Sequence, residues 1–225
     1  MEQIVASNID NLIIVSSVNE PIFNHKTIDR FLVAAESSSI NPIIVINKID
    51  LDVDNSIKKF VSIYSDIGYN TIYTSCITKE NLVQLKETMN GSVSILWGQS
   101  GVGKSTILNL LYPDLNLDTG EVSSSTSKGK HTTVTVSMHK VEKNTFILDT
   151  PGIREIDPYG IKKEDLSHFF IDFIPYINNC RYNTCTHNHE PDCAVEEAVK
   201  KGFISEFRYE SYLRLLYTIE EDIIF

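Results

Sequence analysis

A glycine-rich run that starts at Gly98 is the strongest chemical signal in this sequence of 225 residues. The run fits the pattern GxxxxGK[ST] and continues through Gln99, Ser100, Gly101, Val102, Gly103, Lys104 and Ser105. An apolar stretch typical of a strand precedes it, and a helical pattern opens with Lys104, Ser105 and Thr106. In this setting backbone amides and a helix N-terminus bind phosphate groups. We therefore predict a nucleoside triphosphate site in which Lys104 reaches the β- and γ-phosphates and Ser105 ligates Mg²⁺. Thr106, the next residue, is expected to contact the nucleotide.

A second motif indicates which base the nucleotide carries. The motif consists of Asn47, Lys48, Ile49 and Asp50. It follows the apolar run 43–46, and ligands of open α/β sheets bind where strands end. The carboxylate of Asp50 can accept hydrogen bonds from the ring N–H and the amino group of guanine, and adenine lacks this donor pair. We expect Lys48 to lie along the base, Asn47 to brace neighbouring loops, and the segment with Ser75 and Cys76 to offer a backbone amide to the guanine carbonyl.

Two further segments offer groups for Mg²⁺ and the γ-phosphate. Asp149 and Gly152 belong to a DTPG segment that closes the last expected strand. An aspartate at that position can hold Mg²⁺ through water, and a glycine amide can sense the γ-phosphate. Upstream, a GKHTT segment offers the hydroxyl of Thr132 or Thr133 to complete the Mg²⁺ shell. The sequence does not decide between these two threonines, and both are also ordinary β-branched strand formers.

Hydrolysis needs an oriented water molecule, and the residue that usually orients it is replaced. Many GTPases carry a glutamine directly after the glycine of DxxG, whereas this chain has Ile153. His131, beside the threonine pair, is the best substitute in the sequence. We predict that His131 acts in catalysis together with Lys104 and the threonines. The alternative is a histidine that faces solvent in a loop.

A cluster of cysteines and histidines near the C-terminus indicates a metal site. Its members are Cys180, Cys185, His187 and Cys193, with His189 as a competing ligand by position. Three thiolates and one imidazole form a closed tetrahedral zinc site, which is structural rather than catalytic. In a reducing compartment such a cluster favours metal ligation over disulfides. The alternative is a set of buried free cysteines.

Apolar runs and helical periodicity alternate along the first half of the chain. Strands are expected at 12–18, 43–46, 71–73 and 93–97, and helices at 25–36, 56–64, 79–89 and 104–111. This alternation predicts a doubly wound α/β fold with parallel strands covered by helices. A loop over 113–133 and a hairpin of 134–139 with 145–148 follow. We assign residues 1–158 to a GTPase domain and residues 159–225 to a small, helical, zinc-binding domain.

The order of the motifs resembles that of a known family. Along the chain they read NKxD, TSC, GQSGVGKS, GKHTT and DTPG, whereas ordinary GTPases have the P-loop first and NKxD nearly last. In this order and in the residues of these motifs, the chain resembles the circularly permuted, ribosome small-subunit-dependent GTPase A family. The resemblance covers essentially the whole chain, including Phe23-Asn24 and Glu190-Pro191. It implies a permuted P-loop G-domain.

The same resemblance implies a function. Family membership predicts hydrolysis of GTP to GDP coupled to late maturation of the small (30S) ribosomal subunit, with rRNA contact. It implies one structural Zn²⁺ with His187 as ligand, because the family's histidine stands two residues after the second cysteine, and it also points to His131. Family members carry an N-terminal OB-type barrel, a fold that commonly binds RNA. Because the first expected strand begins near Leu12, we expect the barrel to be absent here.

Composition limits the other functions. A net charge of −10 argues against a protein that coats nucleic acid by bulk charge, and we expect no DNA partner. The sequence lacks an apolar run of membrane-spanning length and a signal peptide pattern, so we expect a cytoplasmic protein. We also expect a monomer, although no sequence feature indicates the oligomeric state. Arg208, Tyr212 and Arg214 are candidate surface contacts on the zinc-binding domain. The alternative is that these residues pack in the interior or face solvent. One rival hypothesis is a nucleotide-gated binding module that hydrolyses little GTP and whose ribosome binding is impaired because the barrel is missing. Another is a P-loop kinase that uses ATP, but Asp50 argues against it because its carboxylate selects guanine over adenine.

Overall fold

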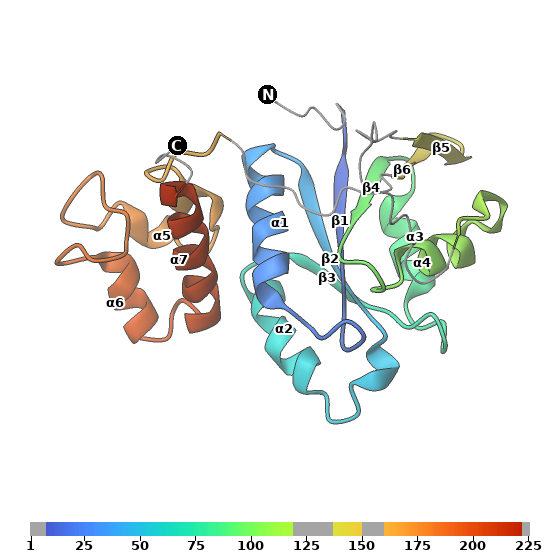
Figure 1. The fold of residues 1–225 in the computed structure, drawn as a ribbon, viewed down its shortest axis with the longest axis horizontal. Coiled ribbons are helices and arrows are strands. Elements are labelled where there is room, and N and C mark those ends of the chain that lie inside the picture. The colour runs from blue at the N-terminus through green and yellow to red at the C-terminus, as the bar shows by residue number, and fades with distance from the viewer. Residues whose placement is uncertain (1–7, 119–136, 150–159, 222–225) are drawn as a thin grey trace, which may run out of the picture. The chain divides into compact units, whose positions relative to one another are not determined.

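The chain forms two compact units in the computed structural model (Figure 1). The structure describes residues 8–118, 137–149 and 160–221. The first unit comprises residues 1–24 and 40–155, and the second comprises residues 25–39 and 156–225. Helix α1 (His25–Ser37) therefore packs with the second unit, although it lies early in the sequence. The domain boundary at residue 158 stays a prediction.

A six-stranded sheet forms the centre of the first unit. Its strands are β1 (Asn11–Ser17), β2 (Asn41–Asn47), β3 (Asn70–Tyr73), β4 (Val93–Trp97), β5 (Ser137–Glu142) and β6 (Thr145–Asp149). Their order is β3-β2-β1-β4-β6-β5, and all neighbours are parallel except the hairpin of β5 and β6. The direction of winding reverses between β1 and β4. In open α/β sheets such a reversal opens the crevice in which ligands bind.

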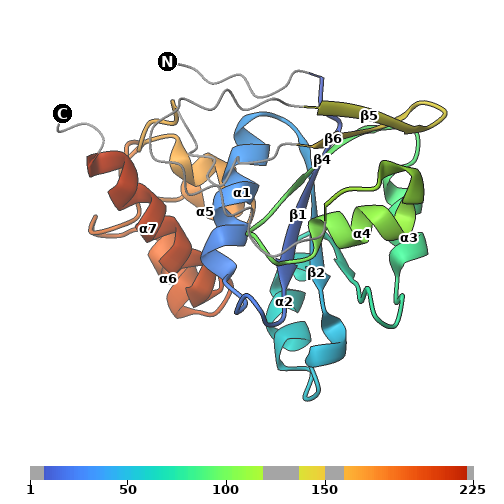
Figure 2. The same ribbon diagram turned by 45° about the vertical axis from the view of Figure 1, so that its right-hand side comes forward.

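Strands β1 and β2 are apolar and buried on both faces, and every second side chain of each strand joins one buried cluster of the first unit. Ile13 pairs with Ile43, and Val15 pairs with Val45. All four are buried and pack in one cluster with α3 (Leu82–Met89) and α4 (Lys104–Leu111). Burial of each such side chain stabilises the fold by about 1.5–3 kcal/mol. Figures 1 and 2 show α3 and α4 together on one side of the sheet, while α2 (Ser56–Asp66) contacts β3.

Helix α3 begins later than the sequence pattern predicts. The pattern indicates a helix from Lys79, whereas α3 begins at Leu82. Lys79 and Asn81 both have positive φ angles, of 61° and 51°. A right-handed helix cannot include such residues, so the turn after β3 delays the helix by three positions. Two short 3₁₀ turns, η1 (Ile49–Leu51) and η2 (Pro113–Leu115), complete the described part of this unit.

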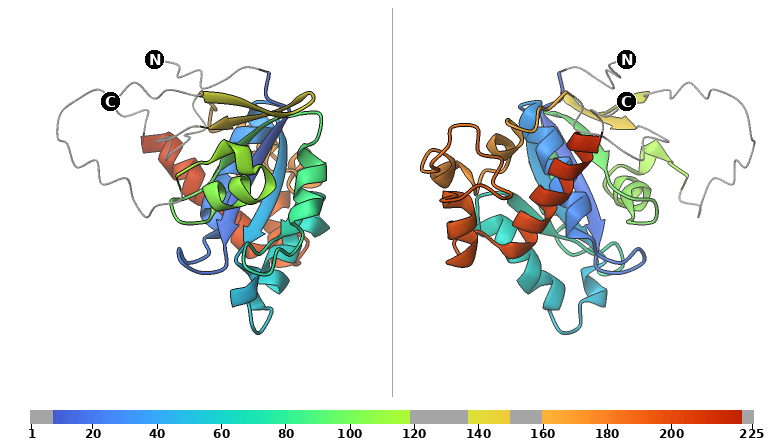
Figure 3. Two further views of the ribbon diagram at one scale, coloured as in Figure 1. Left: turned by 90° about the vertical axis from the view of Figure 1, so that its right-hand side faces the viewer. Right: turned by 60° about the vertical axis from the view of Figure 1, so that its left-hand side comes forward.

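The second unit is less helical than expected before residue 194. Its elements after α1 are η3 (Leu166–Phe169), α5 (Ile174–Ile177), α6 (Ala194–Lys200) and α7 (Glu206–Glu221). Only two four-residue turns lie between residues 160 and 193, where the cysteines stand. The core of the unit is aromatic: the rings of Phe170 and Phe173 each lie within 5.3 Å of Tyr212 on α7. Figure 3 shows α6 and α7 adjacent in this unit.

A buried ionic group also holds the second unit together. The guanidinium of Arg208 on α7 bonds Asp29 of α1 at 2.5 Å and Asp172 at 2.7 Å. Arg208 is 1% exposed and Tyr212 is fully buried. Neither residue can serve as a surface contact, and that prediction is wrong for both; Arg214, in contrast, is exposed. None of the helices in the described residues combines the length and apolar character that crossing a bilayer requires.

Candidate nucleotide and metal sites

Parallel pairing brings the predicted nucleotide motifs to one edge of the sheet. The NKxD motif begins with Asn47, the last residue of β2; the TSC segment follows β3, and the glycine-rich run follows β4. Because β1, β2, β3, β4 and β6 are parallel, their carboxyl ends share that edge. Asp149 is the last residue of β6 and therefore belongs to the same edge.

The glycines of the phosphate-binding run are required by close backbone packing. A Cβ atom at Gly98 would lie 2.0 Å from the carbonyl oxygen of Val15 on β1. A Cβ atom at Gly103 would lie 2.3 Å from Nδ2 of Asn47. Both residues also have positive φ angles, which favour glycine. The loop is thus pressed against β1 and the NKxD segment, and α4 begins directly after Gly103.

Lys104 lies across the glycine-rich loop. Its Nζ atom donates to the carbonyl oxygens of Gly98 at 2.7 Å and Gln99 at 2.9 Å. The ammonium is therefore held over the loop whose amides would face phosphates. Ser105 and Thr106 follow in the first turn of α4, where the helix dipole favours anions. The described part of the site thus brings a cation and the N-terminus of α4 to the glycine-rich loop.

Asn47 joins the predicted base site to the phosphate site. Its Nδ2 donates to the carbonyl oxygen of Val102 at 2.9 Å, and its Oδ1 accepts from Thr74 Oγ1 at 3.2 Å. The Cys76 thiol also lies 3.7 Å from this oxygen, and burial raises its pKa, so it remains a neutral donor. Asn47 is 1% exposed. A change at this amide would therefore disturb both loops at once.

The side chain of Asp50 is fixed by the TSC segment. Ser75 Oγ donates to Asp50 Oδ1 at 2.5 Å and accepts from the amides of Ile77 and Thr78 at 3.2 and 3.1 Å. The sequence suggests only a backbone amide in this segment, so the role of the Ser75 hydroxyl was missed. A TSC tripeptide carries no signal of its own that could reveal it. Because this hydrogen bond holds Oδ1, it also limits the directions in which the second carboxylate oxygen of Asp50, Oδ2, can point.

Lys48 has a partner that the sequence does not reveal. Its Nζ atom donates to the backbone carbonyl of Glu20, in the loop after β1. Phe23 anchors that loop, with its ring 5.6 Å from Phe60 on α2. A backbone carbonyl leaves no trace in residue type, which is why this contact could not be predicted.

Several predicted residues lie outside the part of the chain that the structure describes. These are His131, Thr132, Thr133 and Gly152. Their roles stay predictions.

The cysteine cluster converges as the spacing predicts. The ligand atoms of Cys180, Cys185, His187 and Cys193 all lie within 4.8 Å of one another. His187 Nδ1 is 3.5 Å from the thiol sulfur of Cys180 and 3.4 Å from that of Cys193. His189 is exposed and is not part of the cluster. Burial raises the pKa of Cys185 and of Cys193, so neutral thiols would have to lose protons on metal binding. The donor set fits tetrahedral Zn²⁺.

The fold and the edge of the sheet define a class of protein. A P-loop after β4, an NKxD segment after β2 and their permuted order make this chain a circularly permuted P-loop GTPase. The family model described as RsgA GTPase matches residues 1–159. The chain belongs to the RsgA GTPase family.

Relatives and solved structures agree with this membership. The small ribosomal subunit biogenesis GTPase RsgA of Streptococcus pneumoniae serotype 4 is 44% identical over 214 residues, which cover 95% of this chain and 70% of that protein. The protein of the same name from Caldanaerobacter subterraneus is 39% identical, over 96% of this chain and 72% of that protein. The crystal structure of YjeQ from Thermotoga maritima matches with a TM-score of 0.80 and 36% identity, over 94% of this chain and 72% of that one. The crystal structure of YloQ, a circularly permuted GTPase, matches with a TM-score of 0.76 and 30% identity, over 96% of this chain and 69% of that one.

Proposed function

We propose that this protein hydrolyses GTP to GDP and phosphate and acts in biogenesis of the small ribosomal subunit, in contact with its rRNA. The main support for nucleotide chemistry is the convergence of the P-loop and the Asp50 segment at one sheet edge, joined by Asn47. The names of the relatives support the ribosomal partner. A ribosomal partner supports a cytoplasmic location, and we propose that the protein acts there as a monomer.

Each phosphate-site residue has a proposed task. Lys104 binds the β- and γ-phosphates and offsets charge that develops during transfer. Ser105 and one hydroxyl of Thr132 or Thr133 would hold Mg²⁺ directly, and Asp149 would hold it through water. Mg²⁺ held there would supply positive charge that offsets the negative charge of the phosphates. The amides of the glycine-rich loop orient the phosphates before reaction.

Water activation is assigned to residues outside the described ranges. We propose that His131 orients the attacking water, since Ile153 occupies the position where many GTPases carry glutamine. The amide of Gly152 is proposed to contact the γ-phosphate.

The proposed function is tested by GTP turnover of the zinc-loaded protein with and without small ribosomal subunits. Marked stimulation by the subunits is expected. GTP binding without turnover or stimulation would instead support a nucleotide-gated binding module. Large ribosomal subunits at equal concentration provide the control for nonspecific stimulation by RNA.

Asp50→Asn should change the base preference of the site. Guanine presents two donors to the carboxylate, whereas an amide offers one acceptor and one donor. Because hydrogen bonds to charged groups contribute about 1.5–3 kcal/mol each, GDP affinity should fall roughly 100-fold or more. Xanthine has a carbonyl in place of the amino group, so XDP should bind better than GDP. Competition against a fluorescent nucleotide measures both affinities.

Asp66→Asn, at an exposed position at the end of α2, is the matched control and should leave both affinities unchanged. An unaltered preference for GDP over XDP in Asp50→Asn would contradict the assignment of Asp50.

We propose that the cluster of Cys180, Cys185, His187 and Cys193 binds one structural Zn²⁺. With four protein ligands the site is closed, so the ion supplies folding energy rather than a place for substrate. Two of the cysteines are also members of the hydrophobic core of the second unit. Metal binding and core packing should therefore depend on each other.

Zinc removal should unfold the second unit preferentially. A chelator is expected to remove the part of the near-ultraviolet tyrosine signal that the tyrosines of α7 contribute, while fluorescence of Trp97, the one tryptophan in the sequence, reports the first unit separately. Cys185→Ser should have the same effect. Cys76→Ser, at a cysteine outside the cluster, should keep one zinc per chain. Full retention of the tyrosine signal after metal removal would contradict a structural role for the ion.

A further inference from the structure

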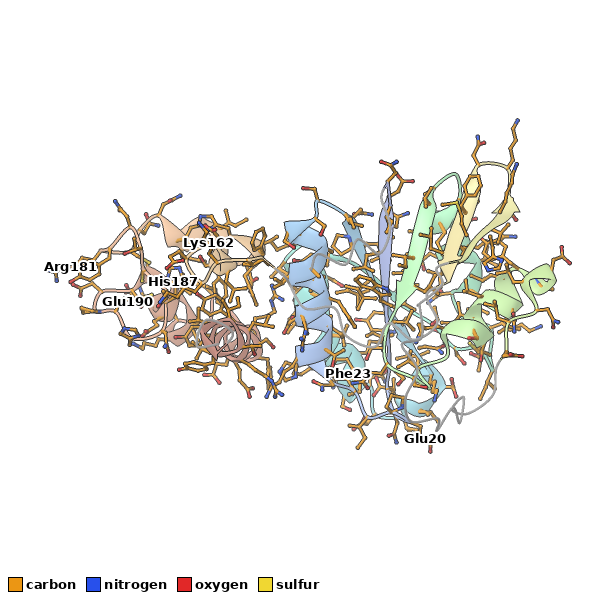
Figure 4. The ribbon with its side chains drawn as sticks, turned by 45° about the horizontal axis from the view of Figure 1, so that its top comes forward. Glu20, Phe23, Lys162, Arg181, His187 and Glu190 are labelled. Carbon is orange, nitrogen blue, oxygen red and sulfur yellow. The ribbon has the colours of Figure 1, made fainter. Side chains whose placement is uncertain are left out.

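One carboxylate accepts hydrogen bonds from several backbone amides of the loop that carries His187. The carboxylate of Glu190 accepts hydrogen bonds from the amide and the hydroxyl of Thr186, both at 2.7 Å, and from the amides of Asn188 at 3.1 Å and His189 at 3.3 Å. Figure 4 labels His187 and Glu190, which lie close together in the second unit. Four donors of one short turn thus end on a single side chain.

The shape of the turn explains why it needs this acceptor. His187 has a φ of 55°, a left-handed conformation that is costly for a residue other than glycine. Successive amides in such a turn point toward a common centre and form a concavity that favours an anion. Burial raises the pKa of Glu190, but hydrogen bonds from Thr186 and Asn188 outweigh it and lower that pKa to about 2. Glu190 therefore supplies the negative charge permanently.

Tyrosines of α7 hold the opposite side of the same turn. Tyr209 Oη donates to the carbonyl of His187 at 2.7 Å, and Tyr212 Oη donates to the carbonyl of Thr186 at 2.7 Å. A third, Tyr217, donates to Asn188 Oδ1 at 3.0 Å. Positions 209 and 212 lie three residues apart and share a helix face. The amides of the turn thus face Glu190, while its carbonyls face α7.

The backbone that carries the His187 ring is bonded on two sides, to Glu190 through amides and to tyrosines of α7 through carbonyls. With the backbone fixed on both sides, Nδ1 lies 3.5 and 3.4 Å from two thiol sulfurs of the cluster. We propose that Glu190 is a positioning residue for zinc: it holds the Thr186–His189 turn so that His187 Nδ1 faces the metal. Its role presupposes the zinc site proposed above. Residues that orient metal ligands typically alter metal affinity 10–100-fold when changed.

Three variants of the full chain separate geometry from charge. Glu190→Gln replaces one acceptor oxygen by an amino group, which cannot accept from the turn. Glu190→Asp keeps the charge but shortens the reach by one methylene. Glu197→Gln makes the same charge change at an exposed residue that pairs with Lys201 on the surface. The zinc dissociation constant is measured by competition with a chromophoric chelator, and the absorption spectrum of the Co²⁺-loaded protein reports the ligand set.

We expect both Glu190 variants to bind zinc about 10–100-fold more weakly than the wild type. We also expect their Co²⁺ absorption spectra to differ from that of the wild type, because the contact of the ion with the His187 nitrogen is disturbed. Glu197→Gln should match the wild type. Wild-type affinity in Glu190→Asp would mean that charge alone matters and would overturn the proposal, as would wild-type affinity in Glu190→Gln. If the wild-type chain binds no zinc, the metal site itself is wrong and the role of Glu190 falls with it.

Thr186→Val provides a milder test should the Glu190 variants fail to fold. It removes only the hydroxyl donor to Glu190, since the backbone amide of residue 186 still donates. Zinc affinity should drop several-fold while the nucleotide affinity stays unchanged. An unchanged zinc affinity and Co²⁺ spectrum in this variant would contradict the proposal.

Discussion

Replacement of Lys104 by alanine is expected to reduce GTP turnover roughly 10²–10³-fold, the usual effect of removing one preorganised electrostatic group. Lys104 Nζ is held over the phosphate-binding loop by the carbonyls of Gly98 and Gln99. The proposed contact with the β- and γ-phosphates would therefore use an ammonium whose position the loop already fixes. Turnover should be measured at saturating GTP, with GDP affinity determined in parallel. Lys104→Arg should not restore activity, because a planar guanidinium cannot occupy the place of a compact point charge.

The control for Lys104 lies on the same unit. Lys59 is exposed on α2, away from the motif loops in the sequence, and Lys59→Ala removes the same charge. Its turnover should equal that of the wild type, and both variants should retain the wild-type midpoint of thermal unfolding for the first unit. Less than a tenfold loss of turnover in Lys104→Ala would contradict the proposed phosphate contact.

The sheet of the first unit follows from sequence periodicity, and its nucleotide motifs follow from residue types and their spacing. Strand β4 and helix α4 have the predicted bounds, because the glycine-rich run between them ends one element and starts the next. The doubly wound class and the permuted motif order are confirmed by the sheet topology and by the solved relatives. Backbone angles explain the error at α3, since the positive φ values of Lys79 and Asn81 are not fixed by residue type.

The second unit shows what periodicity does not reveal. Arg208 has the residue type of a surface position, and its burial depends on Asp29, which is 179 residues away along the chain. Glu190 and the tyrosines of α7 likewise act through loop amides and carbonyls. A single sequence encodes such long-range pairs without any local pattern. The metal cluster was predictable because its ligands are close in sequence and of rare types.

The buried ionic group gives the strongest prediction for stability. Arg208 bonds Asp172 through Nε at 3.3 Å and Nη2 at 2.7 Å, and Asp29 through Nη1 at 2.5 Å. Its guanidinium also lies 4.6 Å from the centre of the Phe170 ring. Removal of the arginine would leave two buried carboxylates without their shared cation. A buried charge that loses its partner costs far more than the pair contributes.

Arg208→Ala should therefore destabilise the second unit by about 3–5 kcal/mol. Denaturant unfolding followed by the tyrosine signal measures this loss, and hydrogen exchange of α1 should rise because Asp29 anchors that helix to α7. Arg214→Ala, an exposed change on the same helix, should stay within about 0.5 kcal/mol of the wild type. Replacing the arginine and both aspartates by apolar residues should recover much of the loss, since no unpaired charge then remains buried. If Arg208→Ala costs no more than Arg214→Ala, the ionic group does not hold α1 and α7 together.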